Sequence, residues 1–154
     1  MKRKYPETDS FIYFNQNPKN KITGDCTFRA ISLALEQDYN TTVMEMAAMM
    51  CKTGYALDDS KGIDYYLKSK GWVKHSQPRM YDNTKYTGKQ FAKWLSINYE
   101  EAELGNIIAN IGGHHITCFK PTYHEEGFNC RYKIHDIWNC SYKCIGNYWT
   151  KERG

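Results

Sequence analysis

The sequence has no long hydrophobic run, and this absence bears on where the protein works. No stretch approaches the ~20 consecutive apolar residues that a membrane-spanning helix needs. The N-terminus carries positive charge at Lys2, Arg3 and Lys4, but no apolar segment follows, as one would in an export signal. We therefore expect a soluble, cytoplasmic protein without a membrane partner.

A strong excess of one charge is absent too. The net charge is only +4, and beyond residues 1–4 and 19–21 the basic residues are mixed with acidic ones. A protein that follows a phosphate backbone usually carries a denser stripe of lysine and arginine. Nucleic acid is therefore not an expected partner.

Cysteine pairs of the Cys-x-x-Cys type are missing, although the chain has six cysteines. A structural zinc site usually shows two such pairs, and the nearest approach here is Cys140-x-x-x-Cys144. Zinc binding stays open as a minor alternative. It would draw on Cys118, Cys130, Cys140 and Cys144, with His114, His124 and His135 nearby. Otherwise we expect free thiols, because no export signal points to an oxidising compartment. We also expect no metal and no cofactor.

The chain does have enough apolar material for one core. Its 154 residues are 41% hydrophobic and include 13 tyrosines, which is far from the composition of disordered chains. This length suits one domain and is short for two. We expect a single domain over residues 1–154, in which residues 1–15 are a candidate flexible arm.

Helical spacing dominates the first hundred residues, where four segments carry apolar residues three or four positions apart. The expected helices begin near Cys26, Thr42, Ile63 and Thr87, the second ending before Gly54 and the third at Gly71. Thr42 with Glu45, and Thr87 with Gln90, match the capping box that begins a helix.

After Gly105 the pattern changes to short strands separated by turns that contain glycine and asparagine. The expected strands are 106–111, 115–120, 131–138 and 144–149, with a hairpin turn at Gly112-Gly113 and a polar loop over 121–127. Helices followed by strands are typical of α+β architecture. The expected fold is therefore α+β, with N-terminal helices, one of them central, packed on a C-terminal antiparallel sheet.

Cys26 stands at the expected start of the first helix, shortly after the turn at Gly24. The unpaired N–H groups of a helix's first turn and the positive end of its dipole favour thiolate over thiol. Cys26 is therefore a candidate nucleophile. An inert core cysteine is the alternative interpretation, since Phe28, Ile31 and Leu35 follow it at helical spacing.

Two of the expected strands carry residues that could complete the chemistry. His115 begins one strand and Asp136 lies on another. If these strands are neighbours, Asp136 can orient His115, and His115 can activate Cys26. Two alternatives stay open: a register shift of one residue would make His114 the base, and Asp136 could instead cap a turn or pair with Arg131.

In this order, the cysteine, histidine and carboxylate resemble the triad of the papain-like cysteine peptidases. In that family a glutamine six positions before the nucleophile supports the oxyanion, and Asn20 holds that position here. The family's orienting asparagine is followed two positions later by a tryptophan that shields the histidine. Asp136 and Trp138 have this spacing, with aspartate in place of asparagine.

The chain also resembles small tailed-phage and prophage proteins that carry Asp-Cys-x-x-Arg-Ala, His-Ile/Leu-Thr, Asp-x-Trp-x-Cys and Gly-Asn-Tyr-Trp. Here these patterns occupy residues 25–30, 115–117, 136–140 and 146–149. The resemblance implies a minimal papain-like fold and a phage source. The triad and its resemblance to the papain-like peptidases imply a cysteine peptidase or amidase that acts on a protein or peptide through a thioester. An inactive papain-like module that occludes a host factor is the alternative function.

Overall fold

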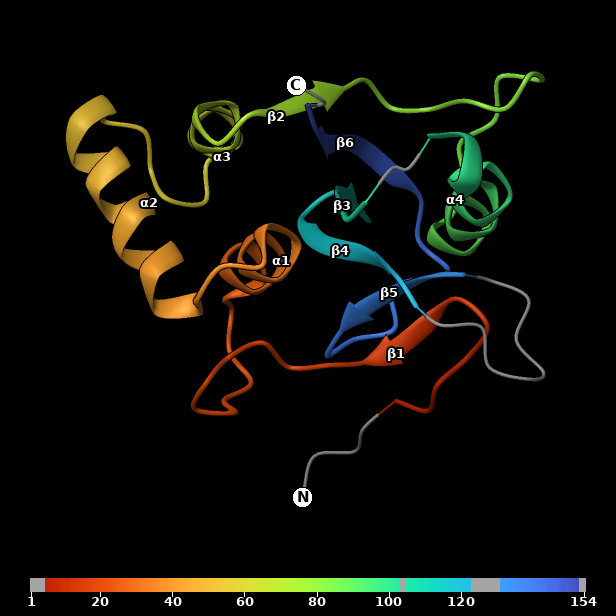
Figure 1. The fold of residues 1–154 in the computed structure, drawn as a ribbon, viewed down its shortest axis with the longest axis horizontal. Coiled ribbons are helices and arrows are strands. Elements are labelled where there is room, and N and C mark those ends of the chain that lie inside the picture. Colours follow the sequence, from red (N-terminus) through yellow and green to blue (C-terminus); the bar gives the residue numbers. More distant parts are fainter. Residues whose placement is uncertain (1–4, 103–104, 123–130, 153–154) are drawn as a thin grey trace.

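The computed structural model describes residues 5–102, 105–122 and 131–152 (Figure 1). Within these ranges it has four helices: α1 (Cys26–Leu35), α2 (Tyr39–Thr53), α3 (Ser60–Ser69) and α4 (Gly88–Ala102). The strands of the same ranges are β1 (Phe11–Tyr13), β2 (Trp72–His75), β3 (Ile107–Ile111), β4 (His115–Pro121), β5 (Tyr132–Asp136) and β6 (Ile145–Lys151). No helix in the described part of the chain has both the length and the apolar character needed to cross a membrane.

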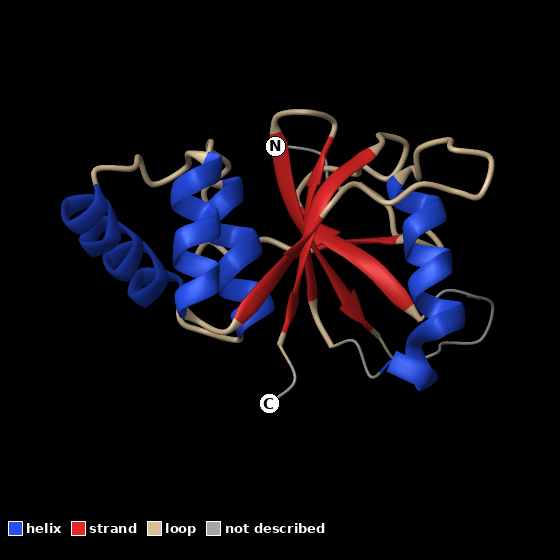
Figure 2. Ribbon diagram, turned by 90° about the horizontal axis from the view of Figure 1, so that it is seen from above, coloured by secondary structure: helices blue, strands red, loops and turns tan. Residues whose placement is uncertain are grey.

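All of these strands join one sheet with the order β1-β5-β4-β3-β6-β2. Neighbouring strands are antiparallel, except that β1 and β5 run parallel. Helices cover both faces: α1 and α3 lie on one side with α2 outside them, and α4 lies alone on the other (Figure 2). The α+β prediction is confirmed, with the sheet forming a central layer between helices.

Each face of the sheet has its own hydrophobic core. Ile31, Met46 and Trp149 are buried in the core beneath α1, α2 and α3, whereas Phe91 and Phe119 belong to the core beneath α4. Because both faces are covered, the central strand β3 needs apolar residues on both of its sides. This explains why its sequence is a nearly continuous apolar run without polar alternation.

The predicted start of α4 is confirmed by its hydrogen bonds. The backbone N–H of Thr87 donates to Gln90 Oε1 over 2.9 Å, and the backbone N–H of Gln90 donates to Thr87 Oγ1 over 3.2 Å. These reciprocal bonds form a capping box. The prediction that Gly54 ends the second helix is also confirmed, since Gly54 is its left-handed C-cap with φ of 80°.

The prediction that Thr42 begins the second helix is wrong. The helix begins at Tyr39, because Asp38 is its N-cap and accepts a hydrogen bond from the backbone N–H of Thr41 over 3.0 Å. Thr42 lies inside the first turn, where its hydroxyl donates to the carbonyl of Asp38. Two capping residues four positions apart compete here, and the aspartate takes the position.

Residues 1–15 were predicted to be a candidate flexible arm, and this prediction is wrong for residues 11–13. These residues form β1, in which Phe11 is fully buried. The backbone N–H of Ile134 also donates to the carbonyl of Ser10 over 2.8 Å, which ties the segment to β5. Neither β1 nor β2 is predicted from the sequence, because strands of three or four residues are too short to show an alternating pattern.

Candidate active site

Cys26 is the first residue of α1 and is half-buried. The preceding residue, Asp25, is the N-cap, but its side chain makes no capping hydrogen bond. The first-turn N–H groups of a helix have no intrahelical acceptor and carry the positive end of its dipole. The structure thus places the thiol where the sequence predicts it, at a helix end that favours negative charge.

His115 and Asp136 come from the neighbouring strands β4 and β5. Nε2 of His115 lies 2.6 Å from Oδ2 of Asp136. The register pairs Cys118 with His135, which puts Thr117 beside Asp136. His114 is exposed in the preceding turn. The structure therefore brings His115, rather than His114, to the carboxylate.

The Asp136 carboxylate is buried and receives two hydrogen bonds on each oxygen. Oδ1 accepts from Arg29 Nη1 over 2.8 Å and from the backbone N–H of Ile137 over 2.7 Å. Oδ2 accepts from His115 and, over 2.7 Å, from Thr117 Oγ1. Burial alone would raise the pKa of Asp136, but these bonds and the charges of His115 and Arg29 lower it. The carboxylate therefore stays ionised and fixed in orientation.

Burial also opposes ionisation of Cys26, but the surroundings of the thiol outweigh it. Hydrogen bonds from His115 and from the backbone N–H of Ile116, with the charges of His115 and Arg29, lower the pKa of Cys26 below its ordinary value. A thiol with a lowered pKa holds more of the thiolate, which is the nucleophilic form.

The pKa of His115 shifts in the opposite direction from that of Cys26. Burial would lower the pKa of His115, but hydrogen bonds to Asp136, Cys140 and Cys26 raise it above the ordinary value. Since Nε2 is engaged by Asp136, the other ring nitrogen is left for a thiol. A lowered thiol pKa beside a raised imidazole pKa favours a thiolate–imidazolium pair at neutral pH.

Trp138 lies against the edge of this pair. Its ring packs on His115 in a T-shaped arrangement with centroids 5.0 Å apart, and Tyr142 makes a second T-shaped contact with Trp138, with centroids 6.2 Å apart. The tryptophan is half-buried and Tyr142 is exposed. Trp138 therefore partly shields the imidazole and its bond to Asp136 from solvent.

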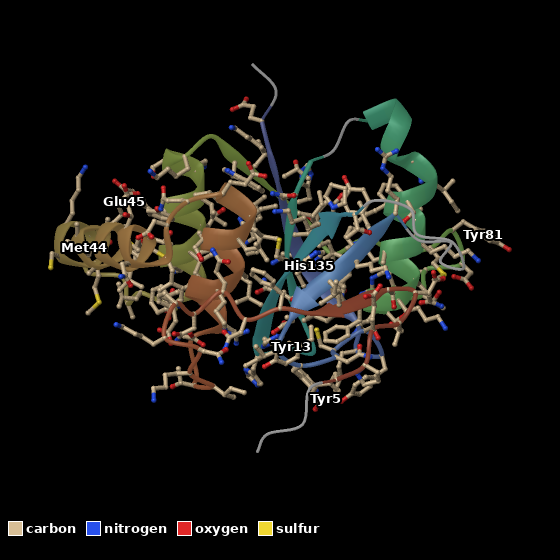
Figure 3. All side chains as sticks on the ribbon, turned by 60° about the horizontal axis from the view of Figure 1, so that its bottom comes forward. Tyr5, Tyr13, Met44, Glu45, Tyr81 and His135 are labelled. Atoms are coloured by element: carbon tan, nitrogen blue, oxygen red, sulfur yellow. The ribbon has the colours of Figure 1, made fainter. Side chains whose placement is uncertain are left out.

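Asn20 is not brought to the thiol. It is exposed, has a left-handed φ of 54°, and its side-chain oxygen accepts from Asn15 Nδ2 over 3.4 Å. A small pocket beside Cys26 is instead lined by Gln16, which is half-buried. His135, labelled on β5 in Figure 3, lines the same pocket. Gln16 therefore contributes a side-chain amide to the lining of this pocket, whereas Asn20 does not line it.

Two larger cavities among the described residues lie away from this chemistry. One of about 700 Å³ is lined by Asp9, Thr87 and residues of α4 that include Lys89. One of about 440 Å³ is lined by Leu35, Trp72 and neighbours at the far end of α1. Neither is lined by Cys26, His115 or Asp136. Size alone therefore does not identify the functional site.

Sequence reasoning missed Arg29, which is buried at the centre of the network. Its Nε lies 2.7 Å from Asp25 Oδ1, and its Nη1 lies 2.8 Å from Asp136 Oδ1. Asp136 therefore pairs with Arg29 and not with Arg131 as the alternative had it. The spacing of four residues between Asp25 and Arg29 was an available signal, because such pairs face each other on a helix.

Cys140 also lies at the site, although the sequence did not predict it beside the triad. It is fully buried, and its sulfur lies within 4.8 Å of the ligand atoms of His115 and Asp136. Histidine, carboxylate and thiol are metal ligands, but Arg29 already occupies Asp136 as a cation. That positive charge disfavours a second cation at the same carboxylate.

The described residues do not support the alternative of a zinc site built from four cysteines. Cys118 belongs to the core on the α1 face and Cys140 to the core on the α4 face, so the sheet separates them. Cys144 is exposed, and it is a free thiol like Cys26, Cys51, Cys118 and Cys140. Cys130 and His124 lie outside the described residues.

The chain matches no protein-family model, and no curated protein or solved structure is significantly similar to it. Its function is therefore inferred from the geometry of its own residues.

Proposed function

We propose that the protein is a papain-like cysteine hydrolase, a peptidase or amidase, and that its source is a phage or prophage. The observation that carries the proposed activity is the position of His115, which bonds Asp136 through Nε2 and also contacts the Cys26 thiol. The motif at residues 25–30 and the Asp-x-Trp-x-Cys motif at 136–140 support the finer family assignment.

In the proposed reaction the Cys26 thiolate attacks the carbonyl carbon of an amide, and the carbonyl electron pair moves to oxygen. As the tetrahedral intermediate collapses, the C–N bond breaks and the His115 imidazolium donates its proton to the leaving amine. The product is a thioester on Cys26. His115, now neutral, removes a proton from water, the resulting hydroxide displaces the thiolate, and the acid product leaves.

The oxyanion of these intermediates needs hydrogen-bond donors. The backbone N–H of Cys26 lies at the start of α1, and the amide of Gln16 lines the pocket beside the thiol. We assign the oxyanion to these two groups, with Gln16 in the role that Asn20 was predicted to fill. Trp138 covers the imidazole, and Asp136 orients it.

The test is the pH dependence of Cys26 alkylation by iodoacetamide, followed by peptide mass spectrometry. Cys51, which is exposed on α2, is the internal comparison in every sample. We expect Cys26 to react well below the ordinary thiol pKa of ~8.5, and to slow at neutral pH in His115→Ala. Exposure to p-nitrophenyl acetate should then give an acetyl-enzyme at Cys26 that water resolves.

Two other results would contradict the hydrolase proposal. If Cys26 reacts no faster than Cys51 and ignores His115→Ala, the hydrolase proposal fails, and the inactive binding module becomes the better explanation. If an acetyl-enzyme forms but is never hydrolysed, Cys26 is a nucleophile without hydrolase activity, and acyl transfer replaces hydrolysis.

A further inference from the structure

Arg29 joins the nucleophile's helix to the strand that carries the triad carboxylate. One turn of α1 separates Arg29 from Cys26, and its guanidinium bridges two carboxylates with different nitrogens: Nε to Asp25 and Nη1 to Asp136. Asp25 is itself anchored, since its Oδ2 accepts from Tyr39 Oη over 2.7 Å and from Asn17 Nδ2 over 3.0 Å.

These ions are deeply buried. The side chains of Arg29, Asp25 and Asp136 are 7%, 8% and 2% exposed. Burying three charges costs more free energy than a well-packed apolar cluster of the same volume would, so stability alone is a weak reason for such a network. Its position between the candidate nucleophile and the orienting carboxylate suggests a role in the chemistry.

We propose that Arg29 is a positioning residue of this site. It fixes the distance between α1, which carries Cys26, and Asp136, which orients His115, and it supplies the cation that the Asp25 and Asp136 carboxylates share. This inference rests on the hydrolase function proposed above. Arg29 itself has no assigned contact with substrate.

The charges around the thiol–imidazole pair decide in which direction the loss of Arg29 would shift the pKa values of Cys26 and His115. α1 contributes Asp25 and Arg29, β4 contributes His115, and β5 contributes Asp136. Three further titratable groups are neutral at pH 7: Cys140 and Tyr39, whose pKa values are raised by burial, and His135, whose pKa burial lowers. Removing Arg29 therefore leaves Asp25 without its partner cation and leaves Asp136 with the His115 imidazolium as its charged partner.

Loss of a nearby cation makes every proton in the cluster harder to remove. The pKa values of Cys26 and His115 should both rise, because Arg29 lowers the first directly and its absence leaves Asp136 with more charge to share with His115. The pH range in which Cys26 is thiolate and His115 is imidazolium should therefore move upward as a whole.

The experiment compares Arg29→Gln, Arg29→Lys and the control Arg79→Gln, in which an exposed arginine outside the site loses its charge. Iodoacetamide alkylation of Cys26 is followed against pH, with Cys51 as the internal standard. For Arg29→Gln we expect the rate at about pH 6 to fall roughly tenfold, with the acid limb moved to higher pH. The control should match the wild type.

Arg29→Lys separates charge from geometry. Lysine keeps the positive charge, but its three donors sit on one nitrogen and cannot replace the planar guanidinium fork that bonds the two carboxylates through different nitrogens. We expect its alkylation profile to stay close to that of the wild type, while acetylation of Cys26 by p-nitrophenyl acetate slows by about 10²-fold because the imidazole is less well placed. If Arg29 were merely structural, Arg29→Lys would not slow acetylation while leaving alkylation unchanged.

The outcomes distinguish this inference from the proposed function. If wild-type Cys26 is activated and a folded Arg29→Gln keeps the same pH profile, Arg29 has no positioning role and the inference is overturned. If neither Arg29 variant has the circular dichroism spectrum of the wild type, the arginine is structural and the inference is again overturned. If wild-type Cys26 already behaves like Cys51, the hydrolase proposal and this inference fall together.

Discussion

His115 Nε2 and Asp136 Oδ2 lie 2.6 Å apart although 21 positions separate these residues in the chain. They meet because β4 and β5 are neighbours in the sheet. Thr117 and Arg29 hold the carboxylate from the other directions, so its orientation does not depend on the histidine alone. An imidazole held by such a fixed acceptor has one ring nitrogen committed and the other free for the thiol.

Replacing the carboxylate by its amide isostere should damage both stability and reactivity. In Asp136→Asn the side-chain nitrogen cannot accept, so Arg29 or His115 loses a buried partner. We expect the free energy of unfolding, measured in urea, to fall by about 3 kcal/mol. Cys26 alkylation near neutral pH should slow as well. The matched control is Asp82→Asn, at an exposed aspartate in a turn. Equal stability of the two variants would contradict a paired, ionised Asp136.

Gln16 and Asn20 can be compared directly as oxyanion donors. Gln16→Ala should slow acetylation of Cys26 by p-nitrophenyl acetate by about 10²-fold, because that reaction passes through an oxyanion. Alkylation by iodoacetamide forms no oxyanion and should keep its rate. Asn20→Ala should leave both reactions unchanged, since Asn20 is exposed and contacts Asn15. The opposite pattern, with acetylation impaired only in Asn20→Ala, would restore the assignment made from sequence spacing.

Trp138 should act through the imidazole that it covers. Trp138→Ala exposes His115 and its bond to Asp136 to water, which weakens their electrostatic interaction. We expect slower acetylation of Cys26, and recovery of most of the rate in Trp138→Phe, which keeps an aromatic ring against the histidine. Trp94→Ala is the control, because Trp94 is an exposed residue of α4 that stacks on Phe91 of the same helix, away from the triad. If Trp94→Ala slows the reaction as much as Trp138→Ala, the shielding role is wrong.

The buried carboxylates predict a loss of stability in acid. Burial would raise the pKa of Asp25, but hydrogen bonds from Tyr39, Arg29 and Asn17 lower it, and the pKa of Asp136 is lowered too. A carboxyl with a lower pKa in the folded state binds fewer protons there than in the unfolded chain. Its contribution is therefore complete above the ordinary value of 3.8 and is lost as the pH falls below it.

Urea unfolding at several pH values measures this contribution. The free energy of unfolding of the wild type should fall steeply below about pH 4. Asp25→Asn should lower stability at neutral pH and flatten that fall, whereas Asp58→Asn, at an exposed aspartate, should change neither. A slope that is the same in all three proteins would mean that Asp25 is not a major source of the acid sensitivity.

The five described cysteines should react in a fixed order. Cys26 is expected to react first, and the exposed Cys51 and Cys144 at the rate of ordinary thiols. Burial raises the pKa of Cys118 to about 12 and also raises that of Cys140, so both should react only after unfolding. Timed alkylation with and without urea, followed by peptide mass spectrometry, gives this order. Rapid labelling of Cys140 in the folded protein would contradict its burial beside His115.

The sequence by itself determined the elements on which the candidate site is built. Helical periodicity and a glycine turn place Cys26 at the start of a helix, and short segments between turns that contain glycine and asparagine place His115 and Asp136 on strands. The capping box at Thr87 and the end of α2 at Gly54 were also readable. All of these signals act within one or two turns of the chain, so they need no knowledge of what lies opposite.

Only the tertiary structure decided which of these residues meet. The bond between Arg29 and Asp136 spans 107 positions, and no local pattern records it. The same holds for Gln16 in the pocket of Cys26, for Cys140 beside His115 and for the parallel pairing of β1 with β5. Such contacts depend on strand order and on which face of the sheet a helix covers, and both are set by burying the whole core rather than by neighbouring residues.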